Sequence, residues 1–422
     1  MKKKRSAPQG VQWKTGRREV LGSLGALTIA TVAGGCTTLT PPPRRTFDVV
    51  VIGAGVFGIW TAYKLHLAGR RVAVIDAIGP AHSNASSGGE GRVTRCGYGD
   101  KELYSEWAWR SISEWQTLSA RTGLPIFHPL GVLWVHTPPS DLVTASARVL
   151  KRQNIPFSLL DAAAMRQRYP VMRVGAEEVG FLEPAGGALM ARRAVQSLAS
   201  ELRANGVTFL SGTVTPIRRE QGEQGALRAI TTQSGERVEA EQFVFACGPW
   251  LDRVCPDAMA RRLFVTRQEV FFFSVDAGAT GALPVWADLP FYGMPSLEGR
   301  GFKVANDTHG PRMDPDTGDR RASAAGEEAA RAFLARRFPS LAKATLSETR
   351  VCQYENSANG DFVIDRHPGL DNVWVVGGGS GHGFKHGPAV GSHVAELVTG
   401  RAKPREPFLI ASKPERQDRA VQ

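Results

Sequence analysis

A glycine-rich motif between two apolar runs constrains the fold of this chain more than any other feature. Residues 47–77 read FDVVVIGAGVFGIWTAYKLHLAGRRVAVIDA, and the apolar run Val49–Ile52 leads directly into a GxGxxG motif. The three glycines of this motif are Gly53, Gly55 and Gly58. A helix-compatible segment follows as far as Ala68, and a second apolar run ends at Asp76. This order of strand, glycine loop, helix, strand and terminal acid predicts a dinucleotide-binding unit.

Each glycine has a steric reason to be there. Gly53 permits the tight turn, Gly55 lets the backbone approach a pyrophosphate, and Gly58 lets the helix pack closely on the strand. The helix N-terminus offers free N–H groups and partial positive charge to the diphosphate. Asp76 lies where a carboxylate accepts hydrogen bonds from ribose hydroxyls. The motif alone does not distinguish FAD from NAD.

Size and charge exclude several classes of protein. The chain has 422 residues, of which 42% are hydrophobic, enough for about two domains. About half of the formal net charge of +12 lies in residues 1–36, and no long basic run follows them. We therefore expect no nucleic-acid surface. Five cysteines are an odd number and too few for a disulfide framework.

The first 36 residues resemble a twin-arginine export signal. Arg17 and Arg18 precede Val20–Gly35, which is too short and too rich in glycine and threonine to span a bilayer. Cys36 follows small residues, as the acylated cysteine of a bacterial lipobox does. A plain cleavage site or a buried cysteine is the alternative. We expect a periplasmic or cell-envelope protein, which acylation of Cys36 would hold to the membrane by lipid.

The middle of the chain alternates between two kinds of strand pattern. Residues 186–212 predict an amphipathic helix ending near Asn205 and then a strand, and EQFVFACGPW predicts a buried strand. VTRQEVFFFSV alternates in a way that suits an antiparallel sheet. Cys247 and Cys255 are expected to be small buried hydrophobic residues.

Small residues and two arginines follow the second predicted strand. NASSGGEGRVTRCGYG, residues 84–99, places Arg92 and Arg95 on a loop or short helix past the nucleotide site, unless they form a solvated charged face. The block resembles Ser-Ser-His-Gly-Asp-x-Arg-x-x-Arg of the monomeric sarcosine oxidase family, whose members include N-methyltryptophan and pipecolate oxidases within the D-amino-acid-oxidase-like flavoproteins. The matching residues are Ser86, Ser87, Gly89, Arg92 and Arg95. Gly88 stands where the family has a histidine.

A lysine in an apolar strand pattern extends the resemblance. Lys303 follows Tyr292 by the same interval as in the family, where the lysine stands over the flavin and assists its reaction with oxygen. A fixed cation in a pocket of low dielectric stabilises the superoxide that forms when oxygen is reduced. From the residues alone, Lys303 is an edge or surface residue. Asp307 replaces a family histidine, which leaves the identity of the substrate open.

A lone cysteine completes the resemblance. In VCQYENSANGDFVID, Cys352 and Tyr354 match the family, in which the cysteine bonds through sulfur to the 8α-methyl group of FAD. Taken alone, this thiol reads as a buried core residue. The glycine-rich run 377–383 lies before the last predicted helix, whose N-terminus would direct positive partial charge at the reduced flavin. Lys385 follows this run.

The resemblance covers roughly residues 47–402 and implies an α/β fold. It comprises a Rossmann-like FAD-binding domain and an antiparallel-sheet (α+β) substrate domain. The expected segments are an export signal (1–36), a linker (37–46), the FAD-binding domain (47–130, 186–260 and 348–402), the substrate domain (131–185 and 261–347) and a C-terminal tail (403–422). The expected cofactor-binding residues are Gly53, Gly55, Gly58, Asp76, Ser86, Ser87, Arg92, Cys352, Gly381, Gly383 and Lys385.

The resemblance also implies a reaction. Arg95 and Lys385 would hold the carboxylate of a small amino acid, Tyr354 would add a hydrogen bond, and Arg92 would lie beside the reacting centre. A secondary or N-methylated amine would be oxidised to an imine, and oxygen would be reduced to hydrogen peroxide near Lys303. A dehydrogenase with another acceptor, an NAD-dependent enzyme and a non-catalytic flavoprotein are the alternatives. We expect a monomer and no metal, since His382 and His386 have no third ligand at suitable spacing.

Overall fold

The computed structural model describes residues 46–217 and 225–415. The predicted export signal, Cys36, nearly all of the linker and the end of the predicted tail lie outside these ranges and stay predictions. The described residues belong to one compact unit. The borders drawn above between an FAD-binding and a substrate domain therefore also stay predictions.

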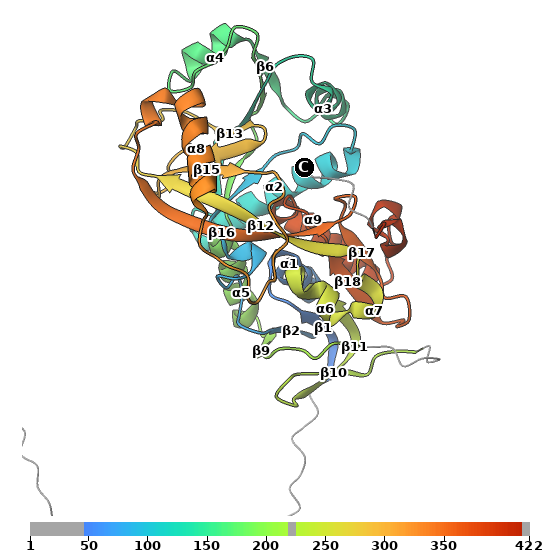
Figure 1. Ribbon diagram of the computed structural model, residues 1–422. Helices are drawn as coiled ribbons and strands as arrows, with labels where there is room; N and C mark the ends of the chain where they lie inside the picture. The colour runs from blue at the N-terminus through green and yellow to red at the C-terminus, as the bar shows by residue number, and fades with distance from the viewer. Residues whose placement is uncertain (1–45, 218–224, 416–422) are drawn as a thin grey trace, which may run out of the picture. The chain divides into compact units, whose positions relative to one another are not determined.

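A mostly parallel sheet forms one layer of the fold (Figure 1). In the described residues its strands run in the order β17-β18-β11-β1-β2-β9, and β10 pairs with the outer part of β11. Strands β18, β11, β1, β2 and β9 are parallel to one another, and β17 and β10 are antiparallel to their neighbours. The bounds are β1 Thr46–Ile52, β2 Val72–Asp76, β9 Thr208–Ser211, β10 Ala229–Thr231, β11 Arg237–Phe245, β17 Val363–Arg366 and β18 Val373–Gly377.

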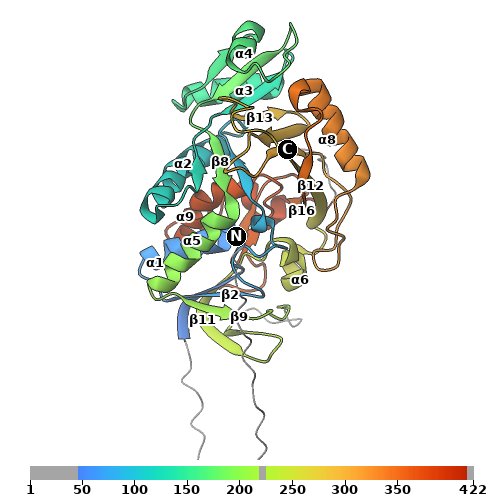
Figure 2. The ribbon, with the colours of Figure 1, turned by 90° about the vertical axis from the view of Figure 1, so that its left-hand side faces the viewer.

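Side chains of β1 alternate between two apolar cores, because successive residues of a strand point to opposite faces. Val49 and Val51 face the core that contains one group of helices, and Val50 and Ile52 face a second core with residues of α6 and α7. The first group lies together on one side of the sheet (Figure 2). Its members are α1 Val56–Leu67, α2 Glu102–Thr122, α5 Ala191–Ala204 and α9 Gly387–Val398. On the other face lie α6 Leu251–Val254 and α7 Pro256–Met259.

A second, mostly antiparallel sheet carries the remaining long strands. Within the described residues its order is β16-β12-β15-β14-β13-β5-β7-β6, and only the β13–β5 pair is parallel. Its bounds are β5 Val132–His136, β6 Ser158–Leu160, β7 Val179–Glu183, β12 Leu263–Phe273, β13 Val285–Asp288, β14 Phe291–Met294, β15 Phe302–Asn306 and β16 Leu346–Ser357. Phe333 and Leu334 of α8 (Ala324–Arg337) share a core with Trp286 of this sheet. The two sheets confirm the predicted α/β fold with a Rossmann-like unit and an antiparallel sheet.

A small third sheet joins the two layers beside the site. It consists of β3 Gly91–Thr94, β4 Phe127–His128 and β8 Gly187–Met190. The other helices are α3 Asp141–Arg152 and α4 Ala162–Arg168. Past residue 402 the chain packs against the fold through buried Phe408 and Ile410. No helix of the described residues has both the length and the apolar character needed to cross a membrane.

Candidate functional site

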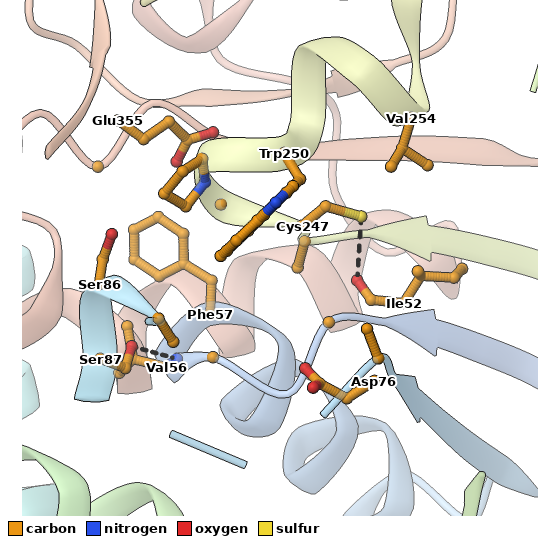
Figure 3. Close-up of a pocket in the computed structure, with 18 of the residues that line it drawn as sticks. Ile52, Val56, Phe57, Asp76, Ser86, Ser87, Cys247, Trp250, Val254 and Glu355 are labelled. Carbon is orange, nitrogen blue, oxygen red and sulfur yellow. Dashed lines mark hydrogen bonds between the residues drawn. The ribbon is translucent and has the colours of Figure 1, made fainter. Parts of the chain in front are cut away.

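A cavity of about 620 Å³ opens where β1, β2, β11 and β18 end (Figure 3). This edge of a parallel sheet is where doubly wound folds bind their ligands, and the volume is in the range of cofactor sites. The wall extends from Asp76 to Glu355 (Figure 3). It includes the predicted residues Gly53, Gly55, Ser86, Ser87, Arg92, Cys352, Gly381 and Gly383. We refer to it as the larger cavity.

The three motif glycines differ in the space around them. Gly53 has φ +101°, and a Cβ there would lie 2.3 Å from the carbonyl oxygen of Ala246. A Cβ on Gly58 would lie 1.9 Å from the carbonyl oxygen of Gly53. On Gly55 the nearest atom to such a Cβ is Ser87 Oγ at 3.6 Å, an ordinary contact. Gly53 and Gly58 are therefore required by the protein itself, whereas only a ligand would require Gly55.

Asp76 and Ser87 hold the glycine loop in shape. The Asp76 carboxylate accepts hydrogen bonds from the backbone N–H of Ala54 at 2.8 Å and of Gly79 at 2.7 Å. Ser87 Oγ accepts from the N–H of Val56 at 3.1 Å, at the start of α1 (Figure 3). Both side chains also line the larger cavity, so they could hold the ligand while supporting the loop.

Substitutions in this loop should separate folding from binding. Gly58→Ala should lower the free energy of unfolding by about 1–3 kcal/mol or more, because the new methyl group meets backbone. Gly55→Ala should leave thermal stability of the ligand-free protein nearly unchanged and weaken cofactor retention. Thermal unfolding by circular dichroism and the cofactor content of purified protein would measure the two effects. Equal loss of stability in both variants would contradict the assignment.

Arg92 connects the serine segment to the cysteine. Its Nη2 donates to the carbonyl oxygen of Ser86 at 2.7 Å and lies 3.5 Å from Cys352 Sγ. Ser86 Oγ donates to the carbonyl oxygen of Gln353 at 2.9 Å, which fixes this segment against β16. The prediction that the two arginines lie on a loop or short helix is wrong for Arg92, which lies on strand β3, and is confirmed for Arg95, which lies in the loop after that strand.

A smaller cavity of about 80 Å³ adjoins the larger one. The two share wall residues, which are Arg92, Cys352, Tyr354, Gly381 and Phe384. Three predicted side chains, Arg95, Tyr354 and Lys385, line the smaller cavity together with Asp307. The structure thus brings the predicted substrate-binding residues to one place beside the predicted cofactor site.

Arg95 lies between two aromatic rings. Its guanidinium carbon is 4.4 Å from the ring centroid of Tyr98 and 4.7 Å from that of Trp134, and one Nη donates to the carbonyl oxygen of Gly97. Behind it, the buried Glu183 accepts from the N–H of Gly97 at 3.1 Å and from Trp134 Nε1 at 2.9 Å. Stacking and hydrogen bonding therefore fix the orientation of the guanidinium in the pocket wall.

Lys385 is buried in a network of polar groups. Its Nζ donates to Tyr98 Oη at 2.7 Å and to the carbonyl oxygen of His382 at 2.9 Å. Burial, aided by the positive charge of Arg95, holds the pKa of Lys385 well below its usual value. An arriving carboxylate would favour the charged ammonium form. His386 also belongs to this network, with its Nε2 2.8 Å from Tyr98 Oη. Among the described residues, no group of three metal-ligating side chains is found.

Lys303 is fully buried on β15, which lies between β14 and β12. The interpretation of Lys303 as an edge or surface residue is therefore wrong. Its Nζ donates to the carbonyl oxygen of Gly91 at 3.0 Å and lies 5.0 Å from the ring centroid of Tyr292. Burial lowers the pKa of Lys303 to about 7. Lys303 is in the wall of neither cavity, and the positive charge of Arg92 adds to the effect of burial in lowering the pKa of Lys303.

Tyr354 and Asp307 form a hydrogen-bonded pair. Tyr354 Oη donates to Asp307 Oδ1 at 3.0 Å and is 3.4 Å from Tyr292 Oη. Burial raises the pKa of Tyr354, so its hydroxyl stays protonated and can serve as a donor. In this structure the Tyr354 hydroxyl, which is predicted to hydrogen-bond the substrate, donates to Asp307, the residue that stands where the family has a histidine.

Gly88 does not enlarge either cavity. It is absent from both walls, and a Cβ at this position would lie 2.0 Å from the carbonyl oxygen of His82. Its own carbonyl oxygen accepts a hydrogen bond from Arg192 Nε at 3.0 Å. The glycine is thus explained by close backbone packing, and His82 is the histidine of this segment that lines the larger cavity.

The glycine-rich run before α9 forms a turn in the wall of the larger cavity. Gly381 has φ +77°, and a Cβ on Gly383 would lie 2.8 Å from the Phe57 ring and 2.9 Å from the Cα of Gly379. Ser380, with φ 45°, is fully buried within the run. Because the glycines of this run pack closely against the Phe57 side chain of α1 and have no side chains of their own, they present backbone atoms to the larger cavity.

The sequence pattern did not predict two wall residues, Trp134 and Glu355, or Tyr98, which supports Arg95 from outside both walls. Tyr98 and Trp134 enclose Arg95, and only the sequence proximity of Tyr98 to Arg95 could have suggested it. Glu355 lines the larger cavity, and burial raises its pKa to about 8. Its position directly after Tyr354 was the available signal. Cys255 is buried as predicted, but Cys247 is only half-buried and lines the larger cavity.

Comparison with known proteins agrees with this geometry. The family described as "FAD dependent oxidoreductase" matches residues 48–397. Monomeric sarcosine oxidase from Arthrobacter sp. (strain TE1826) is 30% identical over 373 residues, which cover 85% of this chain and 94% of that protein. N-methyl-L-tryptophan oxidase from Salmonella arizonae is 28% identical over 361 residues, covering 83% of this chain and 94% of that protein.

Solved structures show the same fold. NikD, described as an unusual amino acid oxidase essential for nikkomycin biosynthesis, superposes with a TM-score of 0.72 at 20% identity, covering 87% of this chain and 98% of that chain. Amadoriase I from Aspergillus fumigatus, a fructosyl amine:oxygen oxidoreductase, gives a TM-score of 0.69 at 22% identity and covers 84% of this chain and 87% of that chain.

Proposed function

This chain belongs to the FAD dependent oxidoreductase family, and we propose from this premise that it oxidises the C–N bond of a secondary or N-methylated amino acid to an imine, with oxygen as the electron acceptor. One observation carries the proposal: a small cavity lined by Arg95 and Lys385 opens beside a cofactor-sized cavity and shares a wall with it. The names of the sarcosine and N-methyltryptophan oxidases support this choice of substrate class.

The larger cavity fits FAD. Its volume is about 620 Å³. Of the three motif glycines, only Gly55 has free space where a side chain would lie, so a ligand can approach the backbone there. The N-terminus of α1 offers backbone N–H groups for a diphosphate. Asp76 is positioned for ribose hydroxyls, and backbone of the 379–383 run faces the same space. FAD, when bound, supplies the two-electron acceptor for amine oxidation.

The smaller cavity binds and orients the amino acid. Arg95 has a fixed guanidinium whose charge complements a carboxylate, and Lys385 Nζ adds a second donor within the same wall. Trp134 and Trp286 form apolar walls that exclude water and strengthen these interactions. Fixing the carboxylate directs the amine end of the substrate toward the shared wall around Cys352 and Tyr354.

Anaerobic reduction tests the proposed function. Purified holoenzyme is mixed without oxygen with N-methylated and cyclic amino acids, and loss of cofactor absorbance is followed. The matched control is the amide of each amino acid, which lacks the carboxylate. We expect each amino acid to reduce the cofactor at a much lower concentration than its amide, which lacks the carboxylate that Arg95 and Lys385 bind. Failure of every amino acid to reduce the cofactor would reject the function.

We also propose that Cys352 is the covalent attachment point of FAD. Its sulfur lies in the wall that the two cavities share, 3.5 Å from Arg92 Nη2. Cys352→Ala should release all of the FAD into the supernatant on acid precipitation, whereas wild-type protein should keep it in the pellet. Cys247→Ala is the matched control, because Cys247 lines the same cavity. Peptide-bound FAD in Cys352→Ala protein would refute the attachment.

A further inference from the structure

We propose that Asp307 binds the positively charged nitrogen of the substrate, so that the smaller cavity recognises both charges of an amino acid zwitterion. The inference rests on the proposed function in that it places the amino acid in this cavity. It adds the residue that selects a cationic group at the end opposite the carboxylate.

Asp307 is held in place from two sides. It directly follows β15, and its backbone N–H donates to the carbonyl oxygen of Pro290 at 2.8 Å. Its carboxylate accepts a hydrogen bond from Tyr354 Oη at 3.0 Å, and Tyr354 is itself 3.4 Å from Tyr292 Oη. The side chain is buried and yet lies in the wall of the smaller cavity. It is therefore a preorganised carboxylate facing the ligand space.

The charges of the wall are arranged as an amino acid requires. The cations are Arg92, Arg95 and Lys385, and Asp307 is the one carboxylate among the described residues that line this cavity. A ligand with a carboxylate alone would be attracted by the cations and repelled by Asp307. A ligand with a carboxylate and a nearby cationic centre would be attracted at both ends, and the buried setting strengthens each interaction.

The size of the cavity limits how far apart these two charges are. Its volume is about 80 Å³, and Trp134, Trp286 and Val270 form much of its apolar wall. This space suits a small amino acid in which one carbon separates nitrogen from carboxylate. Because Arg95 and Asp307 line the same small cavity, we expect the cationic nitrogen of such a ligand to lie close to Asp307 when its carboxylate lies at Arg95.

Two redox-inert ligands of nearly the same shape isolate this charge. Dimethylsulfonioacetate carries a positive sulfur next to its CH₂–carboxylate group, and 3-methylbutanoate carries a neutral CH in the same place. Calorimetric titration of the holoenzyme gives the two dissociation constants, and the shift of cofactor absorbance provides a second readout. We expect the sulfonium ligand to bind at least about tenfold more tightly, because the two ligands differ only in the charge that Asp307 faces.

Variants assign the preference to the residue. Asp307→Asn should abolish it and Asp307→Glu should retain part of it. Asp319→Asn removes a carboxylate whose side chain is 60% exposed, and this control should leave the preference for the sulfonium ligand unchanged. The inference would be overturned if the two dissociation constants of the wild-type protein were nearly the same, or if neither ligand bound. It would also be overturned if Asp307→Asn protein had the same ratio of dissociation constants as the wild-type protein. The wild-type ratio alone decides the matter if Asp307→Asn protein does not fold.

The outcome is distinguishable from failure of the proposed function. If no amino acid reduces the cofactor but the sulfonium preference is present and depends on Asp307, the proposed function fails and the charge recognition stands. If amino acids are oxidised but the two ligands bind alike, the function stands and this inference fails.

Discussion

Replacing Lys303 with methionine is expected to slow reoxidation of the reduced enzyme by oxygen about 100- to 1,000-fold, with anaerobic reduction by the amine substrate changed much less. Removing one preorganised group that stabilises a developing anion typically has an effect of this size. Methionine retains the volume and apolar stem of the lysine in a tightly packed strand, so the change removes mainly the positive charge and its hydrogen bond to Gly91. Stopped-flow measurement of each half-reaction separates the two rates.

The pH dependence adds a test that packing alone would not affect. Because the pKa of Lys303 is lowered to about 7, the ammonium form is present below that pH and is lost above it. Wild-type reoxidation should therefore slow as the pH rises through about 7, and Lys303→Met protein should lack this dependence.

A matched lysine provides the control. Lys101 is exposed and pairs with Asp361, and Lys101→Met should leave both half-reactions unchanged. Equal slowing of reduction and reoxidation by Lys303→Met would remove the role in oxygen chemistry. If the wild-type enzyme itself reoxidises slowly in air but rapidly with an artificial electron acceptor, the protein is a dehydrogenase.

Local steric rules explain why the glycine loop could be predicted from the sequence. Gly58 is required by its contact with Gly53 within one strand–turn–helix unit, and Gly53 is required by its positive φ at the turn and by its contact with Ala246, which directly follows β11. The same is true of the strand that ends at Asp76, whose carboxylate closes the loop by hydrogen bonds to Ala54 and Gly79. Such features repeat wherever this unit occurs, so spacing alone is sufficient to recognise them.

The walls of the smaller cavity could not be predicted in the same way. Asp307 and Tyr354 are hydrogen-bonded across 47 residues of sequence, because β15 and β16 both pair with β12. Trp134 reaches Arg95 from β5, in the other large sheet from the nucleotide loop. These contacts depend on strand order and register, which no local pattern determines.

Gly88 and Glu355 show that residue type alone does not reveal which residues face a ligand. A glycine in place of a histidine suggests an enlarged pocket, yet Gly88 packs against the backbone of His82 and faces neither cavity. Glu355 falls within the buried half of β16, where a carboxylate is unusual, and backbone N–H groups of Gly378 and Gly379 accompany it. Only the packed structure distinguishes a ligand-facing residue from one needed for the backbone.

Replacing Arg95 with alanine is expected to raise KM for an N-methylated amino acid roughly 30- to 1,000-fold. Removing one partner of a buried, hydrogen-bonded charge pair costs about 2–4 kcal/mol, which corresponds to this range. The guanidinium is held between Tyr98 and Trp134, so its orientation is fixed before substrate binds and little binding energy is lost in ordering it.

The substrate series makes the Arg95 prediction specific. KM for the neutral amide of the same amino acid should change less than about threefold in Arg95→Ala protein, and Arg95→Lys should recover part of the affinity for the acid. Arg366→Ala is the matched control, because its guanidinium also stacks on an indole, Trp374, at 4.7 Å but lies in neither cavity. If Arg95→Ala protein loses affinity equally for the acid and the amide, Arg95 supports the pocket wall and does not bind the carboxylate. Lys385 would then be the principal partner of the substrate carboxylate.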